Sequence, residues 1–159
     1  MTLPSVAEVL ADLAARGVIL PEGPVNVGSY GDSETLSAEL IALIVSGAKR
    51  AGTSLLRSHE FDDEPLPRPG NLEVVVDYRG EPVLVTRILT VEVVAFDAVT
   101  PEYARIEGEG DGSLEFWREG HWAFFSRECA RIGCTPCSDM RVVCATFDVP
   151  LIVPARARA

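Results

Sequence analysis

The chain has 159 residues, 47% of them hydrophobic, which is enough for one domain to bury a core without disulfides or metal ions. Its 24 acidic and 14 basic residues give a net charge of −10, which opposes non-specific binding to polyanions, so contact with nucleic acid requires a local basic patch. No apolar stretch approaches the roughly 18 residues of a membrane span, and the N-terminus does not resemble a signal peptide. We therefore expect a cytoplasmic protein with reduced cysteines and no membrane partner.

Capping residues and apolar periodicity predict the helices. Ser5 and Glu8 form a capping box before a first helix, which Gly17 ends. Three further helices carry similar signals, namely residues 34–46, which Gly47 follows, a short helix beginning at Thr100-Pro101, and residues 113–132.

Alternating and β-branched residues predict the strands. They occupy residues 53–57, 71–78, 82–96 and 140–149, with a hairpin turn at residues 78–81. Three segments are predicted as loops, namely residues 23–31, the acidic and proline-rich residues 59–70, and residues 107–112, where acidic residues alternate with glycine. Helices that interrupt hairpin-linked strands are typical of an α+β fold with a curved, mostly antiparallel sheet.

Lys49 is the only lysine, beside thirteen arginines. Burial or a nearby cation can lower the pKa of an ammonium into a useful range, so lysine can act as a base or amine nucleophile near neutral pH, whereas arginine cannot. The simpler explanation is that the charge of Lys49 stabilises the C-terminus of the preceding helix. We take Lys49 as a candidate catalytic residue.

The acidic loop at residues 107–112 resembles a calcium loop only at first sight, because its twelfth position is Arg118 instead of a bidentate glutamate. Glu107 is a candidate general base beside Lys49, and one or two of these carboxylates would suit a divalent metal ion. The alternative is a solvated turn that caps the helix after it.

The predicted helix 113–132 is rich in aromatic residues, most of which follow core spacing. Trp122 lies off that stripe and is a candidate for stacking on a base, whereas His121 is expected to be a semi-buried histidine. Ser126 and Arg127, together with Arg50, Arg57 and Arg87, are candidates for a local basic patch. The alternative is that each arginine pairs with a surface carboxylate.

Cys134 and Cys137 have the two-residue spacing of a zinc knuckle or a redox pair, but a second CxxC motif is missing. Cys129 and Cys144 fall in a predicted helix and strand, where small apolar side chains are the simpler explanation. Structural zinc remains an alternative. No P-loop, dinucleotide fingerprint, GxSxG or HExxH motif is present in the sequence.

Several motifs, taken in order, resemble ASCH-domain proteins over about residues 27–149. They are Tyr30-Gly31-Asp32-Ser33, Gly47-Ala48-Lys49, Pro69-Gly70-Asn71 and, above all, the long motif at residues 108–125. The resemblance implies a PUA-like, small curved β-barrel of about five to six mostly antiparallel strands flanked by helices. We accordingly expect an accessory N-terminal helix at residues 1–22, the ASCH domain at 23–152 and a disordered tail at 153–159.

The resemblance also implies a cleft that faces single-stranded RNA or a modified nucleoside, with no indication of DNA specificity. Lys49 and Glu107 match the family's catalytic positions. The substrate-binding candidates around them are Tyr30, Arg50, Ser54, Arg57, Trp122, Ser126 and Arg127. The leading expectation is an RNA-binding protein with single-strand ribonuclease activity. The alternatives are an amidohydrolase that deacylates a modified nucleoside such as acetylated cytidine, and a non-catalytic RNA- or ligand-sensing module.

One position departs from the amidohydrolase members of the family, which carry a threonine three residues after the lysine. Gly52 occupies that position here. Thr53 follows directly, but alternation along a strand predicts that it faces away from Lys49, whereas Ser54 shares the face of Gly52. The departure favours the ribonuclease expectation, because charge stabilisation at a phosphate does not need the hydroxyl.

Overall fold

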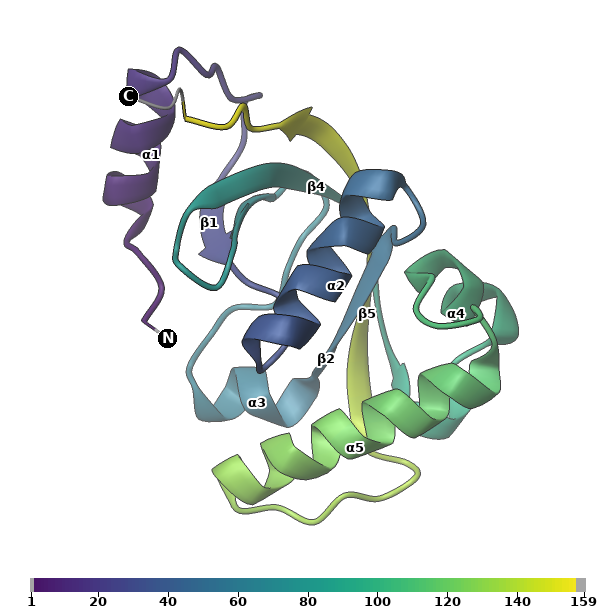
Figure 1. Cartoon of the computed structure of the whole chain (residues 1–159). Coiled ribbons are helices and arrows are strands. Elements are labelled where there is room, and N and C mark those ends of the chain that lie inside the picture. The colour runs from purple at the N-terminus through teal and green to yellow at the C-terminus, as the bar shows by residue number, and fades with distance from the viewer. Residues whose placement is uncertain (1, 157–159) are drawn as a thin grey trace.

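The computed structural model describes residues 2–156 and contains one five-stranded sheet with helices packed around it (Figure 1). The strand order is β1-β3-β4-β5-β2; β1 and β3 are parallel, and the other pairs are antiparallel. The elements, in chain order, are α1 (Val6–Ala15), β1 (Val25–Gly28), α2 (Glu34–Ser46), β2 (Ala51–Leu55), α3 (Leu56–Phe61), β3 (Leu72–Val76), β4 (Pro82–Ala95), a 3-10 turn η1 (Phe96–Ala98), α4 (Pro101–Glu107), α5 (Leu114–Ile132) and β5 (Arg141–Ile152).

The helices predicted from their caps are confirmed. Ser5 and Glu8 form the reciprocal capping box of α1, and the side chains of Ser33 and Thr100 cap α2 and α4. Gly47 ends α2 in the left-handed conformation, with a φ of 92°. These signals succeed because a cap is satisfied within one turn of the chain.

Two elements lie where loops were predicted. Residues 25–28 form the edge strand β1, whose partner β3 lies far along the chain, so no local pattern marks it. The segment after Leu55 is the short helix α3, so β2 is Ala51–Leu55, and Arg57 lies on a helix instead of a strand. The N-terminus of α3 has no side-chain cap, so no capping residue marks its start in the sequence. Glu107 likewise belongs to the end of α4 and not to the loop after it.

The expected closed barrel is not confirmed. Among the described residues, β1 and β2 each pair with one neighbour, so the sheet is open and has two edges. Its curvature nevertheless brings these edges close, because a Cβ added to Gly52 of β2 would lie 3.5 Å from the ring of Tyr30, two residues beyond β1. Side chains, not backbone hydrogen bonds, fill the gap between the edge strands.

The hydrophobic core has three parts, one for each packed helix. Ile44 of α2 packs with Val75 of β3, whereas Val9 and Leu13 of α1 pack against the opposite face of β3, including Val74. The third part lies between α5 and the β2–β5 pair. Alternation along β3 thus directs successive side chains to α1 and α2.

The C-terminal segment begins in an ordered state. Val153, predicted to start a disordered tail, is buried, and its N–H donates to Val83 O at 2.8 Å. Residues 157–159 of that tail lie outside the described residues. Within residues 2–156, none of the helices has the length and hydropathy needed to cross a membrane.

Candidate functional site

Two turns that are far apart in the sequence pack backbone against backbone. Gly108, which ends α4 with a φ of 67°, lies so close to the turn after α2 that an added Cβ would be 1.9 Å from Ala48 O. The N–H of Arg50 also donates to the penultimate carbonyl of α4 at 2.9 Å. This packing places Lys49 beside Glu107.

Gly108→Ala is therefore expected to lower the free energy of unfolding by roughly 3 kcal/mol or more. Alanine would meet the left-handed φ penalty of about 1–2 kcal/mol and, in addition, a clash with a backbone atom that cannot rotate away. Urea unfolding of the variant measures the loss. Gly112→Ala is the matched control, since it has a similar φ of 77° but no atom within 4 Å of an added Cβ. If both variants lost the same free energy of unfolding, the close packing of Gly108 against Ala48 would be contradicted.

Lys49 is a buried ammonium whose three N–H groups all have acceptors. Only 1% of the residue is exposed. Its Nζ donates to Ala51 O at 2.7 Å, to Glu107 Oε1 at 3.2 Å and to Glu109 Oε2 at 3.4 Å. An ammonium has three donors, so its capacity is used completely, and the contact with Glu109 is the longest.

Glu107 is also 1% exposed, and four donors surround its carboxylate. Lys49 and His121 Nε2 lie 3.2 Å and 3.0 Å from Oε1, and Thr53 Oγ1 and Trp117 Nε1 each donate to Oε2 at 2.7 Å. Burial alone would raise the pKa of Glu107, but Lys49 and the hydrogen bonds hold it well below its usual range. Glu107 is therefore a permanently ionised anchor and a poor general base.

Glu109 is the second carboxylate on Lys49 and has a different environment. Its side chain is 20% exposed, and its Oε2 lies 3.7 Å from His121 Nε2. Burial, reinforced by repulsion from Glu107, raises the pKa of Glu109 despite the nearby Lys49. Of the two glutamates, Glu109 is thus the one that can take up and release a proton.

His121 connects this network to α5. Its ring stacks on Trp117 with centroids 4.2 Å apart, and its Nδ1 lies 2.9 Å from Trp117 O, so Nε2 faces the carboxylates. Burial would lower the pKa of His121, but the hydrogen bond with Glu107 and the charges of both glutamates raise it above 6.5. The expectation of a semi-buried histidine is correct, and its partners are the two glutamates.

These two shifts act at opposite ends of the pH range. The lowered pKa of Glu107 gives stability that is present above its ordinary pKa of 4.5 and lost as pH falls below it. The raised pKa of His121 gives stability that is present below 6.5 and lost as pH rises through its folded-state pKa. We expect the free energy of unfolding, measured with urea from pH 5 to 8, to fall less with rising pH in His121→Asn than in the parent protein. If the free energy of unfolding changed with pH equally in both proteins, the raised pKa of His121 would be contradicted.

Thr53 corrects the expectation that it faces away from Lys49. Its hydroxyl donates to Glu107 Oε2 and lies 3.0 Å from Tyr103 OH, so it shares a carboxylate with Lys49. The reason is tertiary packing, because Lys49 lies before β2 and the Glu107 carboxylate bridges the two side chains, with Oε1 on Lys49 Nζ and Oε2 on Thr53 Oγ1.

The remaining members of the cluster were not predicted as site residues. Trp117 and His121 are four residues apart on α5, the spacing that puts two side chains on one helix face, and Glu109 follows Glu107 by two. Tyr103, whose OH also donates to Gly52 O at 2.8 Å, carried no signal in the sequence.

Two of the predicted substrate-binding residues lie beside the cluster. The ring centroid of Tyr30 lies 5.6 Å from Lys49 Nζ, and a Cβ added to Gly52 would be 3.5 Å from the same ring. Ser54 Oγ lies 2.7 Å from His59 Nε2, and His59 Nδ1 is buried without a hydrogen-bond partner among the described residues.

Two others have structural roles. Arg50 donates to the carbonyls of Ile44 and Lys49, which ties the end of α2 to the lysine turn. The hydroxyl of Ser126 donates to the backbone of its own helix at Trp122 O.

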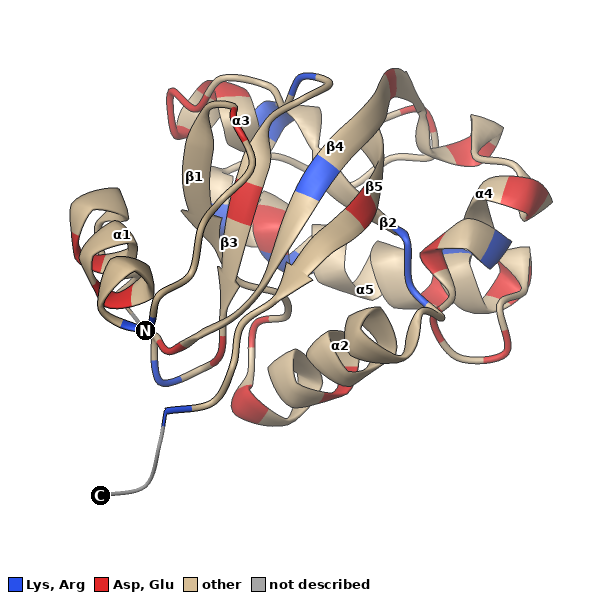
Figure 2. Cartoon of the chain, turned by 90° about the horizontal axis from the view of Figure 1, so that it is seen from above, with Lys and Arg blue, Asp and Glu red and all other residues tan. Residues whose placement is uncertain are grey.

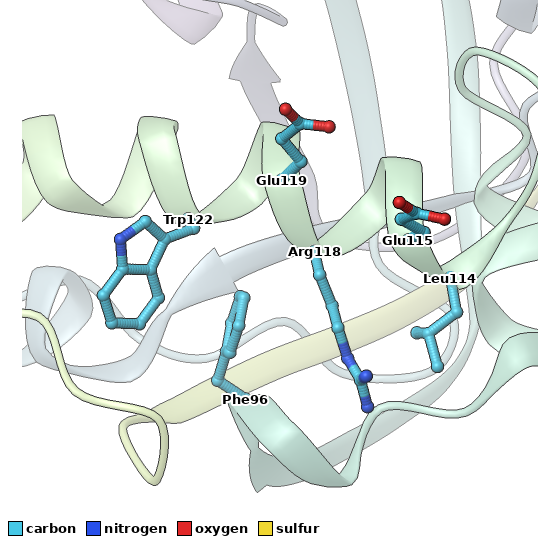
Figure 3. A pocket seen from close by; sticks show the side chains of 6 residues that line it. All are labelled: Phe96, Leu114, Glu115, Arg118, Glu119 and Trp122. Atoms are coloured by element: carbon cyan, nitrogen blue, oxygen red, sulfur yellow. The ribbon is translucent and has the colours of Figure 1, made fainter.

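The last three lie elsewhere. Trp122 borders a cavity of about 750 Å³ between α5 and η1, where its ring meets Phe96 edge-on and Arg118 projects into the same space (Figure 3). Arg57 lines a separate cavity of about 290 Å³, and Arg127 pairs with Asp32 at 2.6 Å. Lys49 lines neither cavity.

The predicted basic patch does not form. Arg87 pairs with Asp148, Arg127 pairs with Asp32, and Arg50 is used by backbone carbonyls. Basic residues are scattered over different elements among more numerous acidic ones (Figure 2). These three arginines thus follow the alternative of pairing with the chain's own acceptors, whereas Arg57 lies apart from them beside the 290 Å³ cavity.

The cysteines are all free, and three of them line the 290 Å³ cavity, namely Cys129, Cys134 and Cys137. Within the described residues, the one group of three potential metal ligands that lie close together is Glu107, Glu109 and His121, whose ligand atoms are within 4.8 Å of one another. The ammonium of Lys49 already contacts both of these carboxylates, so a divalent ion would have to compete with it.

Comparison with known proteins places this architecture in a family. The ASCH domain family model matches residues 26–150. The fold is similar to the ASCH domain from Lactobacillus crispatus JV V101, with a TM-score of 0.75, 34% identity and 79% of each chain covered.

Two further solved structures are similar. Protein EF3133 from Enterococcus faecalis V583 has a TM-score of 0.76 and 28% identity, covering 91% of this chain and 86% of that one. Hypothetical protein PH0355, with a TM-score of 0.52 and 17% identity over 79% of this chain and 98% of that one, shares the fold alone. A search of curated proteins found no match. The matched length and the similarity to a solved ASCH domain together show that this chain belongs to the ASCH domain family.

Proposed function

We propose that this ASCH domain is an amidohydrolase that removes an acyl group from a modified nucleoside, with Lys49 and Glu109 at the reacting atoms. The acylated nucleoside is the substrate class that the family resemblance implies. The chemistry is inferred from the two glutamates on Lys49.

The observation that carries the proposal is the contrast between these glutamates. Glu107 is buried, has four donors and stays ionised, whereas Glu109 is partly exposed, has a raised pKa and makes the longest contact with Lys49. Enzymes often use two carboxylates whose environments push their pKa values apart, so that each takes a different role in the reaction. Glu107 positions the donors, and Glu109 carries the proton.

The reaction follows from the order of these contacts. The acyl oxygen of the substrate displaces Glu109 from Lys49 Nζ, which then stabilises the negative charge of the tetrahedral intermediate. Glu109 takes a proton from the attacking water as the oxygen of that water bonds to the acyl carbon. The same proton passes to the leaving nitrogen as the carbon–nitrogen bond breaks, giving a carboxylic acid and an amine. Thr53 and His121 hold Glu107, and through it Lys49, in place.

A neutral amide fits this site better than a phosphodiester. Two carboxylates already lie on the only lysine, so a phosphate brought to Lys49 would meet negative charge at close range. Three of the four arginines expected to offset this repulsion, Arg50, Arg87 and Arg127, are committed to other partners, and Arg57 lines a cavity that Lys49 does not border. Ribonuclease activity on single-stranded RNA is therefore the second candidate function. A non-catalytic ligand-sensing module is the third.

The test is to incubate purified protein with N4-acetylcytidine and, separately, with labelled single-stranded RNA, both with and without EDTA. We expect release of acetate and cytidine that EDTA does not reduce, because no step uses a metal ion. The matched variant Lys49→Met should be inactive. RNA cleavage with no acetate release would replace the amidohydrolase by a ribonuclease. Ligand binding without turnover in either assay would leave the sensing module.

A further inference from the structure

A second carboxyl group lies near the Lys49 cluster but takes no part in it. Glu73 on β3 is half-buried, and its side chain lies over the backbone of β1 at Gly28, where an added Cβ would be 2.5 Å from Glu73 Oε2. Among the described residues, its carboxyl has no hydrogen-bond donor and no ion-pair partner within reach. The absence of a side chain at Gly28 is what leaves room for it.

No basic side chain among the described residues forms an ion pair with Glu73. Burial raises the pKa of Glu73 to about 7, and repulsion from Glu64 of the following loop adds to the effect. Tyr30 is the other titratable group near it, and it too is kept in its neutral form by burial and by the charge of Glu73. A substantial fraction of Glu73 is thus protonated near neutral pH. Glu73 is only half-buried, so its carboxyl remains open to a ligand with matching polar atoms.

Tyr30 connects Glu73 to the reaction site. It follows Gly28 by two residues, its ring centroid lies 5.6 Å from Lys49 Nζ, and the charge of Glu73 also reaches its hydroxyl. Gly28, Tyr30, Gly52 and Glu73 are all only half-buried, so solvent reaches the surface that they form. An unpaired carboxyl, an aromatic ring and a reactive lysine therefore follow one another across the gap between the edge strands.

We infer that Glu73 anchors the base of the substrate by its Watson–Crick edge, so that the acyl group on that base is directed past Tyr30 toward Lys49. The inference rests on the proposed function and names the part of the substrate that is recognised. A protonated carboxyl offers one donor and one acceptor side by side. The edge of an N4-acylated cytosine offers the complement, with N3 as acceptor and N4–H as donor. Enzymes that act on a base commonly read this edge by hydrogen bonds, beside an aromatic side chain.

The experiment compares Glu73→Ala and Glu73→Gln with the parent protein, using N4-acetylcytidine as substrate. Glu73→Ala is expected to raise KM at least tenfold with a smaller change in kcat, because it removes binding to the base and leaves Lys49 and Glu109 intact. Glu73→Gln is expected to keep most of the affinity, since an amide also presents a donor next to an acceptor. Glu92→Gln, an exposed carboxylate on β4, is the control and should change nothing.

A substrate analogue tests the same contact from the other side. N4-acetyl-N4-methylcytidine lacks the N4–H, so the parent protein should bind it at least tenfold more weakly than N4-acetylcytidine, whereas Glu73→Ala should hardly distinguish the two. Unchanged KM and unchanged discrimination in Glu73→Ala would overturn the role of Glu73 while leaving the proposed function standing. If the parent protein proves inactive, the same comparison by calorimetric binding of both nucleosides decides on Glu73 alone. Melting midpoints verify that each variant is folded.

Discussion

Lys49→Met is expected to lower the free energy of unfolding by about 3–5 kcal/mol, the cost of leaving a buried charge without its partner. Methionine fills the space of the lysine stem but supplies no cation to Glu107, which is 1% exposed. Urea unfolding at constant pH measures the loss. Glu107→Gln should also destabilise the protein, and the double variant should lose at least about 1 kcal/mol less than the sum of the single losses.

The matched control is a surface pair of similar geometry. Arg127 and Asp32 lie 2.6 Å apart, but their side chains are 53% and 42% exposed, so Arg127→Met should cost no more than about 1 kcal/mol. If Lys49→Met were as mild as Arg127→Met, the ammonium would not be the main partner of Glu107. A lysine at this position would then have only the helix-terminal role that its place after α2 also suggests.

Glu109→Gln is expected to lower kcat for acyl release by about 10²–10⁴-fold with little change in KM. The amide keeps the shape of the side chain but cannot take a proton from water. Because Glu109 is partly exposed and makes only the longest contact with Lys49, the melting midpoint should stay close to that of the parent protein. Kinetics with N4-acetylcytidine, paired with thermal unfolding, separate the two effects.

Asp111→Asn in the same loop is the control for this variant. Asp111 accepts a hydrogen bond from the N–H of Ser113 and does not contact Lys49, so its conversion to asparagine should leave kcat unchanged. A Glu109→Gln protein with normal kcat, beside an inactive but folded Glu107→Gln protein, would return the role of base to Glu107. That outcome would also contradict the division of labour inferred from the two environments.

Local signals in the sequence determined four of the five α-helices of the described residues and singled out the lysine. The capping box at Ser5 and Glu8, the N-caps of α2 and α4 and the left-handed Gly47 act within one turn, so they can be recognised without the fold. Four motifs, above all the one at residues 108–125, also sufficed to indicate the family, which the comparisons confirm.

Tertiary structure decided what no neighbouring residue specifies. Strand β1 exists because β3 supplies its hydrogen bonds, and the sheet stays open because β1 and β2 meet through side chains alone. The opposite roles of Glu107 and Glu109 come from donors on β2 and α5 that surround one carboxylate and leave the other near solvent. Which arginines are neutralised was likewise decided by long-range contacts. Caps and periodicity depend on atoms a few residues apart, whereas pKa values and edge pairing depend on burial and on charges that only folding brings together.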